Sequence, residues 1–191
     1  MEPFTIASLS LQLLPVVLKA LPAVIGAFAQ ALGVTRSGDP VRLGDKALQA
    51  EAAGIVPEKY ADFAEYLRAV EDFPLEPDAS LSFSEEEKSF RGALLCVQAI
   101  RERFPLQPVC ELLNVYGRFP MLWSVKTVLV LAEFVLKEPE IVSDIVTYLG
   151  GGQMSDESID RAVNVICAML KADDPSLSDA DADVKALRMR V

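Results

Sequence analysis

The sequence contains no histidine, one tryptophan and three cysteines among its 191 residues. The absence of histidine excludes His-ligated metal sites, Ser-His or Cys-His nucleophile pairs and pH switching by imidazole. Cys96, Cys110 and Cys167 are widely spaced and have apolar neighbours, so they form no CxxC pair and are expected to be small core residues. Such free thiols are typical of a protein made in a reducing compartment.

The residue patterns of phosphate loops and catalytic pairs are also missing. Gly150, Gly151 and Gly152 are followed by Gln-Met-Ser, whereas a phosphate loop would continue with Lys and then Ser or Thr. The acidic cluster 85–87 lies where a first helical turn is predicted, and there it complements the helix dipole. We therefore expect a protein that is not an enzyme and that uses no metal and no cofactor.

Charged residues are scarce in the first part of the chain. Residues 1–35 contain only Glu2 and Lys19, so residues 36–191 carry the whole net charge of −10. A negative surface repels phosphate, which argues against a nucleic-acid partner. The sequence therefore divides into an apolar N-terminal segment (1–35), a linker rich in turn residues (36–43) and an acidic helical body (44–191).

The acidic body has helical periodicity nearly throughout, with no hairpin turn and no sustained alternation of apolar and polar residues. Ser84 and Glu87 have the spacing of a capping box. The three glycines at 150–152 are expected to end a helix and to act as a hinge. The fold class is therefore all-α, a multi-helix bundle or irregular helical array with a long, proline-kinked apolar N-terminal helix. The expected helices of the body span roughly 44–53, 57–73, 84–104, 108–116, 120–137, 139–149, 155–171 and 179–189.

Residues 4–33 form the most apolar run of the chain. On a helix with about 100° per residue, its polar, proline and glycine positions fall in a stripe roughly 80° wide, which we call the polar seam. At about 1.5 Å per residue this run would be about 45 Å long, enough to cross a hydrocarbon core of roughly 30 Å. Its prolines would bend the helix, and its lysine would need a lumen or another seam to face. The polar seam consists of Ser8, Gln12, Pro15, Lys19, Pro22, Gly26 and Gln30.

Residues 120–137 form a second apolar run. Lys126, Glu133 and Lys137 share one face of the predicted helix, and apolar residues cover most of the rest. About eighteen residues that hold three charges are more typical of a buried helix than of a membrane span. We expect these three residues to form a second buried stripe.

Three placements of residues 4–33 stay open at this point. The helix inserts into a membrane, packs on neighbouring subunits, or is buried within its own chain. The acidic start Met1-Glu2-Pro3 and the interruption by Lys19 argue against a secretory signal peptide. The compartment is left undetermined, with a membrane or a virion as the candidates.

In layout, an apolar segment joined to an acidic helical body, the chain resembles small pore-type proteins such as holins and bacteriophage ejection proteins. The resemblance implies an oligomer whose N-terminal helix inserts into or perturbs a lipid bilayer. The alternative is a structural or assembly protein, such as a virion or chaperone-like component, whose N-terminal helix packs on other subunits. A seven-residue near-repeat at 14–17 and 21–24 favours this alternative. The expected partner in both cases is a second copy of the chain or a larger assembly.

Overall fold

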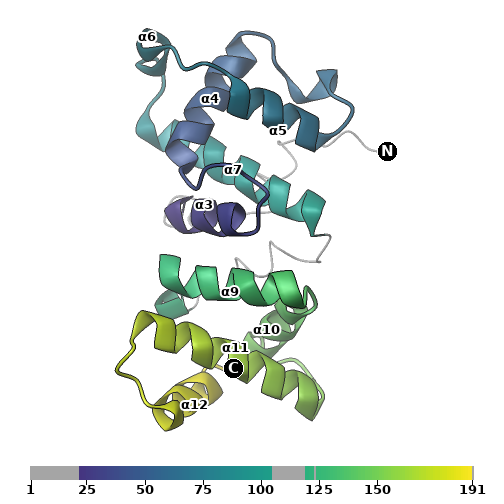
Figure 1. Cartoon of the computed structure of the whole chain (residues 1–191), viewed down its shortest axis with the longest axis vertical. Helices are drawn as coiled ribbons and strands as arrows, with labels where there is room; N and C mark the ends of the chain where they lie inside the picture. Colours follow the sequence, from purple (N-terminus) through teal and green to yellow (C-terminus); the bar gives the residue numbers. More distant parts are fainter. Residues whose placement is uncertain (1–21, 105–118, 123, 191) are drawn as a thin grey trace. The chain divides into compact units, whose positions relative to one another are not determined.

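The computed structural model describes residues 22–104, 119–122 and 124–190 (Figure 1). In these parts of the chain every regular element is a helix and none is a strand, so the predicted all-α class is confirmed. The chain divides into two compact units, Met1–Pro105 and Leu106–Val191, called unit 1 and unit 2 below.

The long, proline-kinked N-terminal helix is not supported. Residues 1–21, including the predicted bend at Pro15, lie outside the described residues, and so does the helix expected at 108–116. The described part of the apolar run is the ten-residue helix α3 (Pro22–Ala31).

Helix α7 is the centre of unit 1, because α3 and α4 both pack along it and α5 packs on α4 and α7. Its buried face includes Leu95, and facing side chains such as Ile25 of α3 and Tyr66 of α5 are also buried. Within the described residues, the elements of unit 1 are α3, α4 (Pro40–Ala52), the 3-10 turn η1 (Pro57–Lys59), α5 (Phe63–Asp72), α6 (Pro77–Ser80) and α7 (Glu85–Arg103).

Two glycines allow α4 and α7 to cross at very short distance. A Cβ atom added to Gly44 would lie 1.7 Å from the carbonyl oxygen of Lys88, and one added to Gly92 would lie 1.8 Å from that of Pro40. No side chain fits at either position, so backbone packs directly on backbone at this crossing.

Helices α4 and α5 differ from the predictions at their first residues. α4 begins at Pro40 rather than near residue 44, because the Asp39 carboxylate accepts hydrogen bonds from the amides of Val41 (3.0 Å) and Arg42 (3.2 Å). The predicted linker 36–43 therefore contains the first turn of this helix. The expected helix 57–73 is interrupted after η1, and α5 starts again where the Asp62 carboxylate caps the helix.

Helix α11 is the centre of unit 2, because α9, α10 and α12 each pack against it. Tyr148 of α10 is fully buried, and its hydroxyl donates to the carbonyl oxygen of Ala186 in α12 (3.1 Å). Ile145 and Ile166 are also fully buried in this core. In the part of unit 2 that the structure describes, the elements are η2 (Pro120–Leu122), α9 (Val125–Lys137), α10 (Ile141–Leu149), α11 (Asp156–Asp173) and α12 (Asp179–Arg188).

The predicted capping box of α7 is confirmed. The Ser84 hydroxyl accepts from the Glu87 amide (3.2 Å), and the Glu87 carboxylate accepts from the Ser84 amide (2.7 Å). The Ser84 amide, and after it the Ser84 hydroxyl (2.8 Å), donate to the Glu87 carboxylate and hold its pKa below the usual value.

Candidate functional site

The polar seam is only partly within the described residues. Ser8, Gln12, Pro15 and Lys19 lie outside them, while Pro22, Gly26 and Gln30 are in α3. Gly26 is buried, and a Cβ atom there would lie 2.4 Å from the carbonyl oxygen of Gly38. Gln30 is exposed and donates to the carbonyl oxygen of Arg36 (3.2 Å). The described end of the seam therefore faces the connection between α3 and α4 of its own unit.

The apolar side chains of α3 are also buried within unit 1. Val24, Ile25, Phe28 and Ala29 are buried, and α3 packs along α7. Among the described residues, no helix combines the length and apolar character that a bilayer crossing requires.

The prediction of a second buried stripe is wrong. Lys126, Glu133 and Lys137 are all exposed on α9. The buried face of this helix lies on the other side, where Leu131 and Val135 pack in the core of unit 2. The helix is confirmed over Val125–Lys137, whereas residues 120–122 of the predicted helix form the separate turn η2. The charged face is open because the core covers only part of the apolar surface of α9, on the side away from the charges.

That second face carries exposed apolar side chains. We call it the α9 stripe, and its members are each between 42% and 53% exposed. On a helix with about 100° per residue, its three helical members lie within about 40° of one another and beside Lys126 and Glu133. Exposed apolar side chains grouped in this way are typical of interaction surfaces. The α9 stripe consists of Met121, Val125, Leu129 and Leu136.

The three glycines after α10 form an ordered turn. Gly150 is the C-cap of α10, and Gly151 has a positive φ of 71°, which favours glycine. The amide of Gly152 donates to the carbonyl oxygen of Thr147 (2.9 Å), and the guanidinium of Arg190 donates to that of Gly152 (3.1 Å). The predicted helix end is confirmed, and the hinge stays a prediction.

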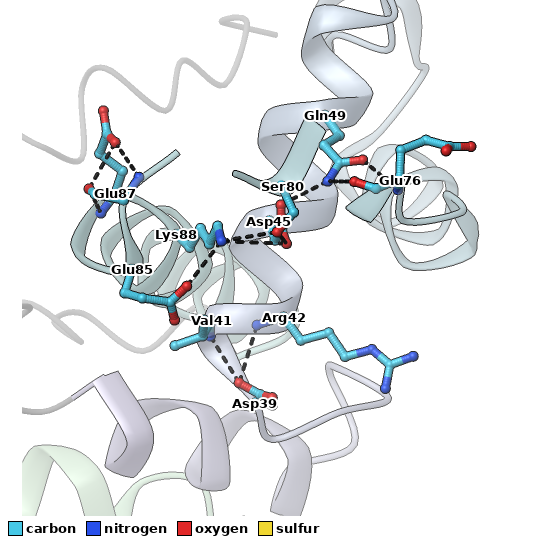
Figure 2. A network of polar contacts seen from close by, with 11 residues as sticks. Asp39, Val41, Arg42, Asp45, Gln49, Glu76, Ser80, Glu85, Glu87 and Lys88 are labelled. Carbon is cyan, nitrogen blue, oxygen red and sulfur yellow. Dashed lines mark hydrogen bonds and ion pairs between the residues drawn. The ribbon is translucent and has the colours of Figure 1, made fainter. Parts of the chain in front are cut away.

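A buried polar network connects α4, α6 and α7 (Figure 2). The buried ammonium of Lys88 donates to Ser80 Oγ and Glu85 Oε1, both at 3.0 Å, and lies 3.8 Å from Asp45 Oδ2. Asp45 also accepts from Ser80 Oγ (2.6 Å) and Gln49 Nε2 (2.9 Å). Each buried charge thus has partners on more than one element. The buried members of this network are thus paired with one another and are not free for a ligand, and removing one of them would leave an uncompensated buried charge.

A second group of charged residues surrounds an open cleft of about 330 Å³ in unit 1. Arg36 from the α3–α4 connection, Arg68 of α5 and Arg103 of α7 all line it, and we call it the arginine cleft. Its floor includes the buried side chains of Phe63 and Leu67. The sequence gives no local signal for this cleft, because its arginines come from distant parts of the chain.

The arginines of the cleft differ in how they are paired. The Arg36 amide donates to Glu71 Oε1 (2.7 Å), and its guanidinium forms ion pairs with Asp72 and Glu71. Asp72, and after it Glu71, raise the pKa of Arg36. Within the described residues, Arg68 and Arg103 have no ion pair. Of the three arginines that line the cleft, only Arg36 is therefore in an ion pair with a described residue.

Nothing in the described residues forms a recognisable catalytic centre. No three side chains of the described residues are placed to hold a metal ion together. Burial raises the pKa of the Cys96 thiol to about 12. Burial and the acceptor Asp183 (3.2 Å) raise that of Cys167 to about 11, so both thiols are poor nucleophiles near neutral pH.

Comparison with known proteins gives no family for this chain. No protein-family model, curated protein or solved structure matches it.

Proposed function

We propose that the chain is a non-enzymatic helical assembly protein that pairs with a second copy of itself through the α9 stripe. The observation that carries this proposal is the exposure of three apolar side chains along one face of α9, together with exposed Met121 in η2 just before it. Burying them against a partner removes apolar surface from water, which is the main driving force of protein association.

The charges beside the stripe favour a second copy as the partner. In an antiparallel helix pair with twofold symmetry, the same flank of both helices meets. Lys126 and Glu133 lie on one flank, seven positions apart, and neither has an ion pair among the described residues. Pairing about a point between residues 129 and 130 brings Lys126 of each chain beside Glu133 of the other, so two reciprocal ion pairs form.

The apolar side chains require nearly the same register. Leu129 would meet its own copy at the twofold axis, while Val125 would meet the copy of Leu136 when the axis lies between residues 130 and 131. The registers set by charge and by apolar contact agree within about 1.5 positions, or about 2 Å along the helix. This agreement between the two registers supports a single arrangement of the pair, in which the charged and the apolar contacts form together.

A single short helix pair is a small interface. Stable interfaces bury at least about 1,000 Å² in total, and a pair of thirteen-residue helices is near this limit. We therefore expect a dimer that dissociates at micromolar concentration. The substitution Leu129→Glu removes two half-buried leucines per dimer and places two carboxylates at the axis, so it should weaken the dimer by about thirtyfold or more.

Sedimentation velocity over a range of concentrations tests the proposal. Wild type should shift from monomer to dimer, and Leu129→Glu should stay monomeric. The matched control is Leu187→Glu, because Leu187 is also an exposed leucine (58%, against 42% for Leu129) and lies on α12 of the same unit. A wild type that stays monomeric at about 100 µM, or a Leu187→Glu variant as monomeric as Leu129→Glu, would refute the pairing.

The membrane-active alternative has one remaining support, which is that residues 4–18 carry no charged side chain. Release of a trapped dye from liposomes decides between the two functions. The assembly proposal expects wild type and a variant without residues 1–21 to leave the liposomes intact. Leakage caused by wild type alone would favour the membrane function and contradict the proposal.

A further inference from the structure

The two unpaired arginines of the arginine cleft are a feature that self-association does not use. Arg68 and Arg103 come from different helices and line the same cleft. Two carboxylates also line the cleft: Glu71 accepts from the Arg36 amide, and Glu102 accepts from Gln98 Nε2 (2.6 Å). Among the described residues neither of them forms an ion pair with Arg68 or Arg103. Two guanidinium groups therefore remain available to an anion.

The surroundings of the cleft are positive although the whole chain is strongly negative. A smaller hollow of about 180 Å³ shares Arg36 and Glu71 with the cleft and adds Arg42 and Lys46 to the lining. Together the two hollows are lined by five basic and two acidic side chains, whereas the net charge of the chain is −10. Charge of this sign, concentrated in a concave site, attracts anions at short range.

The floor of the cleft is apolar. Phe63, Leu67 and Ala99 line it and are each at most 5% exposed, so they contribute a small apolar area at the base of the cleft. A volume of about 330 Å³ is at the lower end of the range for small-molecule sites. A ligand that fits both parts has an anionic group for the arginines and an apolar body for the floor.

From this geometry we infer that the arginine cleft binds a small organic anion, in which a phosphate or carboxylate is attached to an apolar body about the size of an aromatic ring. The planar guanidinium groups of Arg68 and Arg103 donate to the oxygens of the anion, and the ring lies on Phe63 and Leu67. Guanidinium groups suit this role because they present paired donors to phosphate and carboxylate oxygens. This site does not depend on the pairing of α9, which lies in the other unit.

The test is a titration of the full chain followed by amide NMR shifts. The probes are phenyl phosphate and phenylacetate, with inorganic phosphate supplying the anion alone and phenol the ring alone. At least one of the two aromatic anions should bind with a Kd of about 1 mM or tighter, at least tenfold tighter than inorganic phosphate or phenol. The tighter of the two identifies the headgroup that the cleft prefers.

Substitutions then locate the site. Arg68→Ala and Arg103→Ala should each weaken binding about tenfold or more, because each removes charge-assisted hydrogen bonds. Arg68→Lys should restore only part of the affinity, since lysine keeps the charge but not the fork of donors. Arg101→Ala is the matched control, because Arg101 is exposed in the same last turn of α7 as Arg103 but does not line the cleft.

Three results would overturn the inference. The first is that neither aromatic anion causes a saturable shift up to about 10 mM. The second is that inorganic phosphate or phenol binds as tightly as the aromatic anions. The third is that Arg101→Ala weakens binding as much as Arg103→Ala does. The amide spectrum of each variant reports its fold at the same time, so loss of binding and loss of structure are distinguished.

Discussion

Substitution of Gly44 by alanine should destabilise the protein, although the same change stabilises an ordinary helix. The added Cβ atom would lie 1.7 Å from the carbonyl oxygen of Lys88, where real Cβ atoms do not come within 3.0 Å. The obstacle is backbone and cannot rotate away. Helices α4 and α7 must therefore move apart along the largest helix contact of unit 1.

Two opposing terms set the magnitude. Replacing glycine by alanine within a helix gains about 1 kcal/mol from backbone entropy and helix propensity. Forcing extra volume into a packed interior costs about 1–3 kcal/mol when side chains can adjust, and more when backbone is the neighbour. We therefore expect Gly44→Ala to lower the free energy of unfolding by about 2 kcal/mol or more. Gly92→Ala should behave alike, because its Cβ would lie 1.8 Å from the Pro40 carbonyl oxygen.

Urea unfolding followed by far-UV circular dichroism measures this effect. Because both glycines lie at one helix crossing, the double variant should lose less stability than the sum of the single losses. Ala52→Gly, at an exposed position of α4, is the control for helix propensity and should cost at most about 1 kcal/mol. A Gly44→Ala protein as stable as wild type, or more stable, would refute the close crossing of α4 and α7.

Two further predictions concern buried groups of the described units. Lys88→Met leaves the buried Asp45 without its cation, so it should lower the free energy of unfolding in urea by about 3 kcal/mol or more. Adding Asp45→Asn should recover part of that loss. A double variant less stable than Lys88→Met would contradict the pairing. Burial, and after it Asp183, raise the pKa of Cys167 from 9.0 to about 11, so its thiolate fraction at pH 8 should be about a hundredfold smaller than that of an unperturbed thiol. Alkylation by iodoacetamide at pH 8 should therefore be slower than for an unperturbed thiol and should accelerate as the pH rises towards 11. Asp183→Ala removes the carboxylate that helps to raise this pKa, so it should increase the rate of alkylation. Mass spectrometry of the peptide that contains Cys167 measures this rate. An unchanged rate would exclude the contribution of Asp183 to the raised pKa.

Helix ends were predictable where their chemistry is local. The capping box of Ser84 and Glu87 and the glycine C-cap of α10 each depend on residues within one turn of each other. The starts of α4 and α5 carry signals of the same kind, an aspartate before proline and an aspartate three positions before glutamate. The predicted linker 36–43 includes Asp39 and the predicted helix 57–73 includes Asp62, so both predictions miss the residue that caps the helix.

Long-range features could not be predicted from the sequence. Gly44 and Gly92 are unremarkable helix glycines until the fold brings each against another backbone. Arg36, Arg68 and Arg103 belong to three elements whose proximity depends on the packing of unit 1. Periodicity correctly identified α9 as a helix, but it could not tell which of two apolar faces the core would cover.

A charge-reversal cycle on α9 tests the proposed assembly most directly. Lys126→Glu or Glu133→Lys alone turns two attractive contacts per dimer into repulsive ones. Each contact loses an attraction of about 0.5 kcal/mol and gains a repulsion of about 0.5 kcal/mol, so the dimer loses about 2 kcal/mol. Each single reversal should therefore weaken the dimer by about thirtyfold in sedimentation experiments at low salt. The double reversal Lys126→Glu with Glu133→Lys should restore the wild-type affinity. Dimers that are insensitive to the single reversals, or a double variant that stays as weak as the single ones, would contradict the antiparallel pairing of α9.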